Sequence, residues 1–151
     1  MKKLLIVCML FVISILNAQE TEQEKVKMTI ATFFDGLHKG DTAIIGKTIN
    51  KDIKLQTTGV NREGKTMLRT QSKMDFLNGI ANRNPEEKWF EKLLSYDIEI
   101  DGTLASVWTP YEFYRNDEFS HCGTNSFQLY KNNGHWEIVY LIDTRRRADC
   151  K

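Results

Sequence analysis

The sequence has little of several features that mark special classes of protein. Two prolines and nine glycines in 151 residues exclude collagen-like and low-complexity chains. Lys and Arg number 21 against 20 Asp and Glu, and this formal net charge of +1 argues against a general nucleic-acid binder. The sequence lacks a phosphate-binding P-loop, a GxSxG nucleophile motif, an HExxH zinc motif and an EF-hand loop. No cofactor and no metal site are therefore predicted.

The composition that is present is that of an ordinary globular protein. Hydrophobic residues make up 41% and aromatic residues 11% of the chain, which is too apolar for a disordered protein. The length suits one domain and is short for two. No internal repeat and no linker rich in Gly, Pro or Ser divides it. We expect a single soluble domain.

The first 18 residues have the pattern of a secretory signal peptide. Lys2 and Lys3 precede an apolar run over 4–16, which is followed by a small residue, Ala18. The run is shorter than the roughly 20 apolar residues that span a bilayer. We predict cleavage after Ala18 and a secreted or periplasmic protein without membrane association; the alternative is a buried N-terminal helix. Cleavage removes two lysines and no acid, leaving 19 basic and 20 acidic residues and a net charge of −1.

Two cysteines remain after cleavage. Cys8 lies inside the apolar run, whereas Cys122 and Cys150 belong to the mature chain. An even number of cysteines in an oxidising compartment indicates a disulfide between Cys122 and Cys150, which would hold the C-terminal tail on the domain. The alternative is two independent thiols. Their spacing matches no zinc or redox motif.

The periodicity of apolar residues changes along the mature chain. A polar, flexible leader is expected over 19–25, and one domain over 26–151. The first half favours helices and the second half strands of alternating apolar residues. We predict an α+β fold in which the helices cover one face of a long antiparallel meander. The expected helices are 26–39, 41–49 and 72–81, and the expected strands are 53–58, 65–70, 94–100, 104–115, 119–131 and 136–144.

Local signals mark the ends of these elements. Asp41 is a candidate N-cap for the second helix, and Ser72 with Asp75 resembles a capping box for the third. Asp101-Gly102, Asn116-Asp117 and the segment 132–134 are typical hairpin turns. Pro110, within a strand, implies a bulge, an edge or a bend. His38 and His135 lie beside turn residues and are expected to be solvated.

Two-residue turns predict which strand residues face each other. If Arg115 opposes Glu118, then Glu112 opposes His121; if Asn132 opposes His135, then His121 also opposes Arg146. One sheet face, the one that the helices should cover, would then carry Trp108, Glu112, Tyr114, Phe119, His121, Asn125, Phe127, Leu129, Trp136, Ile138, Tyr140 and Ile142. The other face would carry more polar residues, including Thr109, Tyr111, Cys122, Asp143 and Arg145.

A row of Glu112, His121 and Arg146 on a largely apolar face is the main candidate for chemistry. A carboxylate beside an imidazole fixes its tautomer and stabilises the imidazolium, as a general acid–base pair requires. The alternative is a structural ion-pair network at the rim of the sheet. A slip of one residue in either hairpin would place these side chains on opposite faces.

Five segments of the C-terminal third form a recognisable set: residues 107–114, 119–123, 125–127, 134–138 and 143–146. Together they resemble the lumazine-binding branch of the nuclear transport factor 2-like, or SnoaL-like, superfamily. The resemblance implies a cone-shaped fold with a curved antiparallel sheet around helices, a pocket between them, and often a homodimer formed through the sheet. The motif positions that carry over are His121, Gly123, Asn125, Asp143, Arg145 and Arg146. The aspartate base and tyrosine donor of the ketosteroid-isomerase-like members have no matching motif here.

We therefore expect an exported domain that binds a small aromatic or anionic molecule in the cone. The cavity walls would include Phe33, Phe76, Trp108, Phe127 and Tyr140, and the polar groups His121, Asn125, Asp143, Arg145 and Arg146. One alternative is an isomerase, dehydratase or hydrolase that uses His121 and Glu112 as an acid–base pair. Another is a structural or partner-binding domain whose interior is a packed core.

Overall fold

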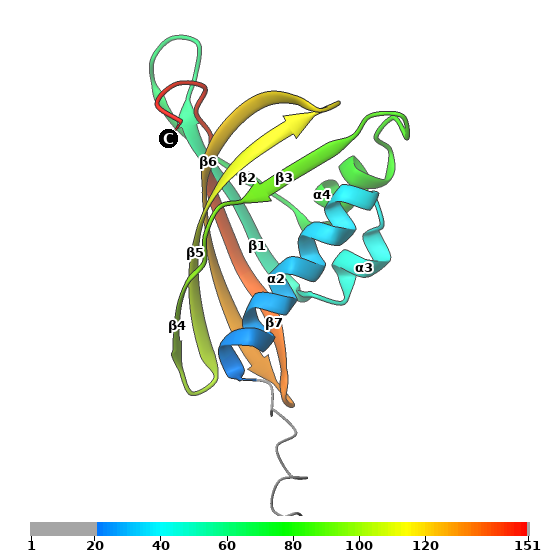
Figure 1. Cartoon of the computed structure of the whole chain (residues 1–151), viewed down its shortest axis with the longest axis vertical. Helices are drawn as coiled ribbons and strands as arrows, with labels where there is room; N and C mark the ends of the chain where they lie inside the picture. Colours follow the sequence, from blue (N-terminus) through cyan, green and yellow to red (C-terminus); the bar gives the residue numbers. More distant parts are fainter. Residues whose placement is uncertain (1–20, 151) are drawn as a thin grey trace, which may run out of the picture.

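The computed structural model describes residues 21–150, so the predicted signal peptide and its cleavage site lie outside the described residues. Within these residues, three helices lie on one side of a curved sheet (Figure 1). The helices are α2 (Glu22–Lys39), α3 (Thr42–Gly46) and α4 (Lys73–Ala81). The strands are β1 (Ile49–Val60), β2 (Thr66–Gln71), β3 (Trp89–Leu93), β4 (Asp97–Asp101), β5 (Leu104–Arg115), β6 (Glu118–Asn132) and β7 (His135–Thr144). None of the helices in residues 21–150 is long and apolar enough to cross a membrane.

Helix α2 begins earlier than the apolar periodicity predicts. Thr21 caps it and forms a reciprocal capping box with Glu24, so the part of the expected leader from Glu22 to Lys25 is helical. The prediction of a flexible segment was wrong there because the capping signal outweighs the lack of apolar residues. Gly40 ends the helix in the left-handed conformation at φ 72°.

The other two helices begin at the predicted caps. Asp41 accepts hydrogen bonds from the backbone N–H groups of Ala43 and Ile44, and Ser72 accepts one from Asp75. Helix α3 is shorter than expected, since it ends at Gly46. Ile49, expected on this helix, is instead the first residue of β1.

The sheet has the strand order β2-β1-β7-β6-β5-β3, and β4 also pairs with β5. All neighbouring strands are antiparallel except β1 and β7, which run parallel. The α+β prediction is confirmed, but the sheet is mixed rather than wholly antiparallel. The parallel pair joins the first and last strands of residues 21–150, which a meander of consecutive hairpins does not produce.

The strand expected over 94–100 is β4, which begins at Asp97, and an additional strand that was not predicted, β3, precedes it on the same edge of β5. Strand β3 pairs with residues 111–115 of β5, and β4 with residues 104–108. The chain leaves the sheet between them, beside Pro110, whose carbonyl accepts a hydrogen bond from the Leu94 N–H at 2.9 Å. Because proline offers no N–H for a ladder, it marks the gap between the two strands.

The hairpin turns have the predicted pairing, but two bulges change the register beyond them. Arg115 pairs with Glu118 as expected, after which Ser120 has no partner and His121 pairs with Phe113. Asn132 likewise pairs with His135, after which Val139 has no partner. Each extra residue shifts the remaining pairs by one position, so side chains expected on one face lie on the other.

The core lies between α2 and the inner face of the sheet. Val26, Ile30, Phe33, Phe34 and Leu37 form the buried stripe of α2. Phe33 stacks on Phe76 of α4 and meets Phe127 of β6 edge to face. The sheet contributes Ile53, Leu55, Ala105, Val107, Phe127, Leu129, Trp136 and Ile138.

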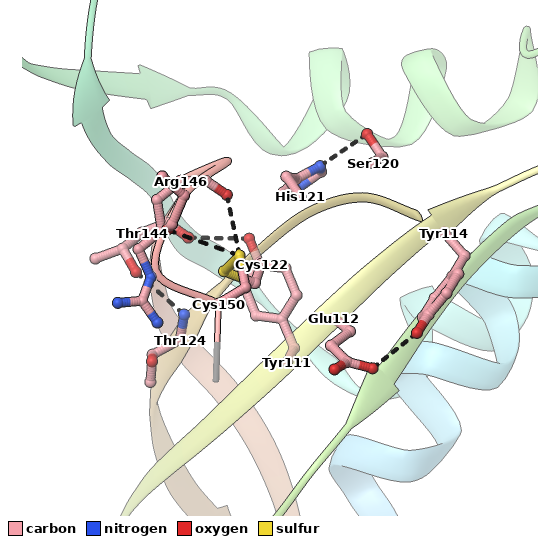
Figure 2. The surroundings of a disulfide bond; sticks show 11 residues. Tyr111, Glu112, Tyr114, Ser120, His121, Cys122, Thr124, Thr144, Arg146 and Cys150 are labelled. Carbon is pink, nitrogen blue, oxygen red and sulfur yellow. Dashed lines mark hydrogen bonds between the residues drawn. A yellow bond between two sulfur atoms is a disulfide. The ribbon is translucent and has the colours of Figure 1, made fainter. Parts of the chain in front are cut away.

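A disulfide between Cys122 and Cys150 holds the C-terminal segment against β6 (Figure 2). The two Cα atoms are 5.8 Å apart. Backbone hydrogen bonds in both directions between Cys122 and Arg146, of 3.0 and 2.9 Å, extend the sheet by one further bridge. The segment that follows β7 is therefore fixed by covalent and hydrogen bonds.

Gly123 allows a close approach of three strands. A Cβ atom at this position would lie 1.8 Å from the Thr144 carbonyl oxygen and 2.8 Å from the Tyr111 ring. We expect Gly123→Ala to lower the free energy of unfolding by about 3 kcal/mol, because backbone would have to move to accommodate the methyl group. Gly46→Ala, where nothing lies within 4 Å, is the control and should change stability little. Urea unfolding of both variants measures this; equal stabilities would contradict the close approach.

The Cys122–Cys150 disulfide should stabilise the folded protein. Cys150→Ser should lower the free energy of unfolding by roughly 3 kcal/mol, because the unfolded chain regains the entropy of the open loop. Urea unfolding without reductant measures the difference. Reductant should bring the wild-type protein down to the stability of the variant and leave the variant unchanged. A wild type that is insensitive to reductant would contradict a stabilising role.

Candidate functional site

A cavity of about 1190 Å³ opens between the helices and the inner face of the sheet. Its helix side is apolar, whereas its sheet side and mouth combine apolar and polar residues, a mixture found in small-molecule sites. The helices contribute Phe33, Phe34, Leu37, Phe76 and Ile80, and the sheet contributes Trp89, Phe113 and Leu141.

A row of polar residues crosses the sheet beneath this cavity. The pairings of neighbouring strands place Arg69, Thr57, Asp143, Asn125 and Thr109 side by side on the inner face. Asn125 is 4% and Asp143 8% exposed. Polar groups buried to this extent need hydrogen-bond partners.

Asp143 is the most heavily hydrogen-bonded member of the row. Its Oδ1 accepts from the Thr57 hydroxyl at 2.6 Å, and its Oδ2 lies 2.9 Å from Arg145 Nε and 3.1 Å from the Tyr111 hydroxyl. The Tyr111 oxygen also lies 2.9 Å from the Thr144 carbonyl. These donors satisfy the carboxylate and hold β1, β5 and β7 together.

Glu91 supplies a second carboxyl group to the floor of the cavity. Its Oε1 accepts a hydrogen bond of 2.7 Å from Asn125 Nδ2. Burial raises the pKa of Glu91 to about 7, and the nearby Asp143 charge adds to the effect. Glu91 can therefore give up or take a proton near neutral pH.

His38 positions the backbone of Glu91. The Glu91 N–H donates to His38 Nε2 at 2.9 Å, so the last turn of α2 is tied to β3. Burial lowers the pKa of His38, which favours the neutral ring that can accept this bond. The expectation of a solvated His38 was wrong, because β3 packs against it.

His121 lines the cavity, but its predicted partner does not. Glu112 pairs with Cys122 rather than His121 and accepts a hydrogen bond of 2.8 Å from the Tyr114 hydroxyl (Figure 2). The predicted Glu112–His121 pair was wrong because the Ser120 bulge turns the two side chains to opposite faces. Ser120 Oγ, 3.1 Å from Nδ1, is the hydrogen-bond partner of the His121 ring, and burial lowers the His121 pKa.

The other predicted site residues divide between the two faces. Phe76, Asn125, Asp143, Arg145 and Arg146 line the cavity, although the predicted strand register placed Asp143 and Arg145 on the outer face. Trp108, expected in the cavity wall, is 54% exposed and pairs with Ser126 on the outer face. Tyr140 also lies outside, where its hydroxyl donates to Gln56. Phe127 is fully buried in the core.

Arginine side chains surround the cavity mouth. Arg62, Arg69, Arg115, Arg146 and Arg147 all line it and are exposed. Within residues 21–150, no group of three or more His, Cys, Asp or Glu is placed to hold a metal ion. The polar side chains that line the cavity offer hydrogen bonds, charge and an exchangeable proton on Glu91.

The sequence prediction missed Glu91, Thr57 and Arg69. Glu91 lies in β3, which was not predicted, although Trp89, Glu91 and Leu93 alternate as the inward positions of a short strand. A glutamate in an otherwise apolar alternation is the signal that could have found it. Thr57 and Arg69 carry no such local signal.

The fold is similar to the folds of several solved structures. A nuclear transport factor 2-like protein of unknown function from Shewanella baltica has a TM-score of 0.60 and 21% identity, covering 84% of this chain and 95% of its own. A nuclear transport factor 2-like protein from Cytophaga hutchinsonii has a TM-score of 0.67 and 10% identity, covering 83% and 99%. The chain has the nuclear transport factor 2-like fold. A protein of unknown function from Nostoc punctiforme, described as cystatin-like, aligns with a TM-score of 0.65 and 15% identity over 85% and 95%.

These likenesses establish the fold, since the sequence identities are low. No protein-family model matches the sequence, and no curated protein is significantly similar to it. The comparisons do not assign the chain to the lumazine-binding branch. The cavity and the residues that line it are therefore the basis for a functional proposal.

The pKa of Glu91 predicts a specific pH dependence of stability. Above its ordinary pKa of 4.5 the unfolded carboxyl ionises while the folded one, with a pKa of about 7, does not. Wild type should therefore lose stability relative to Glu91→Gln between about pH 4.5 and 7, by at most ~3 kcal/mol, and not further above pH 7. Urea unfolding of both proteins across this range measures the difference.

Glu137→Gln is the matched control for this experiment. Hydrogen bonds from Asn132 and Asn50 lower the pKa of Glu137, so its contribution to stability is lost as the pH falls. The two variants should therefore show opposite trends. A difference between wild type and Glu91→Gln that does not vary with pH would contradict the raised pKa.

Proposed function

We propose that this protein is an exported domain that binds a small organic molecule in the cavity between its helices and its sheet. The observation that most supports this proposal is a cavity of about 1190 Å³. Aromatic side chains line it, and several polar groups converge on its floor. Such a combination is the usual form of a ligand site. An open cavity of this size argues against the alternative of a purely structural, packed interior.

Two features support the details of this proposal. Glu91, Asn125 and Asp143 offer both donors and acceptors to the deep end of a ligand. The Cys122–Cys150 disulfide supports export, because structural disulfides persist mainly in oxidising compartments. It joins the predicted signal peptide as a second, independent indication.

A fluorescent apolar probe tests binding in the cavity. N-phenyl-1-naphthylamine should bind the wild-type protein with one-to-one stoichiometry and rise in fluorescence. Gly79 lines the cavity three residues after Phe76, on the same side of α4, with no atom within 4 Å of an added Cβ. Gly79→Phe should fill the space and weaken binding at least about tenfold, a change of ~1.4 kcal/mol.

Gly46→Phe is the control for this experiment. Gly46 also has open space around it, but it does not line the cavity. This variant should bind the probe as wild type does. Binding that survives in Gly79→Phe, or no binding to wild type, would overturn the proposed function.

Acid–base catalysis in the same cavity is a second candidate function. The observation in its favour is Glu91, a carboxyl group with a pKa of about 7 beside an apolar cavity. The predicted pair of His121 and Glu112 no longer supports an enzyme, so Glu91 is the residue to test. A reaction catalysed by this site should follow a single ionisation near pH 7 and disappear in Glu91→Gln while the probe still binds.

A further inference from the structure

The floor of the cavity carries acidic groups, and its mouth carries mainly basic ones. Its floor holds two carboxyl groups, Glu91 and the buried Asp143. Its mouth carries exposed arginines, among them Arg62, Arg147 and Arg69, which lies at the edge-strand end of the polar row. These arginines outnumber the other acidic residues of the cavity lining, Glu87 and Asp149. A ligand that lies along the cavity therefore meets an acidic environment at one end and a basic one at the other.

The basic mouth is assembled from two distant parts of the chain. Arg62 lies in the turn between β1 and β2, and Arg69 lies in β2. Arg146 and Arg147 follow β7, in the segment that the disulfide holds against β6. The β1–β2 hairpin and the C-terminal segment lie at the same end of the molecule (Figure 1), where the Arg145 N–H donates to the Thr58 carbonyl at 3.2 Å.

Four of these arginines keep their charge available for a ligand. Arg115 forms a salt bridge with Glu87, and Arg145 forms one with Asp143. Within the described part of the chain, no salt bridge engages the remaining four, which are Arg62, Arg69, Arg146 and Arg147. A group of unpaired guanidinium groups around an apolar opening attracts an anion and can hydrogen-bond to it.

We propose that the ligand of this cavity is an elongated amphipathic anion, a deduction that rests on the proposed function. Its apolar body lies among Phe76, Trp89 and Phe113, and its anionic head group lies at the mouth against the four arginines. The opposite orientation would place the head group at the floor, where Arg145 is already engaged by Asp143 and the buried carboxyl groups of Glu91 and Asp143 disfavour a further anion. The deep end of the ligand is therefore neutral and carries a hydroxyl or similar group for Glu91 and Asn125.

Two probes that share one aromatic body test this proposal. 1-Anilinonaphthalene-8-sulfonate differs from N-phenyl-1-naphthylamine by a single sulfonate group. We expect the sulfonate to bind at least about tenfold tighter in low salt at pH 7.5, and the advantage to shrink as salt screens the arginines. The neutral probe should displace the sulfonate, because both bodies occupy the same cavity.

Arginine variants locate the contribution of the head group. Arg62→Gln with Arg69→Gln, and Arg146→Gln with Arg147→Gln, should each weaken sulfonate binding about tenfold and change binding of the neutral probe less than twofold. The side chains are exposed, so glutamine should not disturb folding. Lys47→Gln with Lys54→Gln is the matched control, since it removes two exposed charges that do not line the cavity, and it should change neither affinity.

The outcomes separate this proposal from the proposed function. If neither probe binds, the ligand-binding function is overturned and the proposal falls with it. If the neutral probe binds but the sulfonate gains nothing, or the arginine variants weaken both probes equally, the anion proposal alone is overturned. Decanoate and decyl phosphate, used as competitors, distinguish a carboxylate from a phosphate head group, and failure of both to displace the sulfonate would also overturn it.

Discussion

The carboxylate of Asp143 is the interaction on which the floor of the cavity depends. A buried negative charge is costly unless donors surround it, and here Thr57, Tyr111 and Arg145 supply them from β1, β5 and the end of β7. The same tyrosine packs against Gly123 of β6, where no side chain would fit. Four strands are thereby fixed around one acid, and Glu91 and Asn125 take their positions beside it.

The cavity follows from how the helices and the sheet share apolar surface. The aromatic contacts of Phe33 with Phe76 and Phe127 bring α2 and α4 onto the sheet. The sheet bends toward α2 at β3, where the Glu91 N–H bonds to His38, whereas the β1–β2 hairpin extends beyond the helices (Figure 1). Side chains there line an open space instead of a packed interface, so carboxyl groups and arginines can lie close to aromatic rings. Their placement is what makes the site chemically polar at both ends and apolar between.

Local signals predicted the elements of the fold well and the faces of the strands poorly. The caps at Asp41 and Ser72 and the hairpin turns are correct because a few neighbouring residues determine them. The bulges at Ser120 and Val139 depend on packing across the whole sheet. Neither serine nor valine is a residue type that predicts a bulge. Each bulge moved candidate residues from the face that the predicted register gave them: Glu112 and Tyr140 lie outside the cavity, and Asp143 and Arg145 line it. Glu91 was missed because its strand has five residues and lies beside Pro110.

The parallel pairing of β1 with β7 also has a consequence for how the protein folds. The hydrogen bond between Thr57 and Asp143 joins residues 86 positions apart. Contacts between such distant parts of the chain have a high loop-closure entropy and slow the folding of small domains. The floor of the cavity can therefore form only when the two ends of the sheet meet, which is close to the completion of the fold. A chain in which these two strands have not met lacks the floor of the cavity, so the capacity to bind depends on the complete sheet and not on any one hairpin.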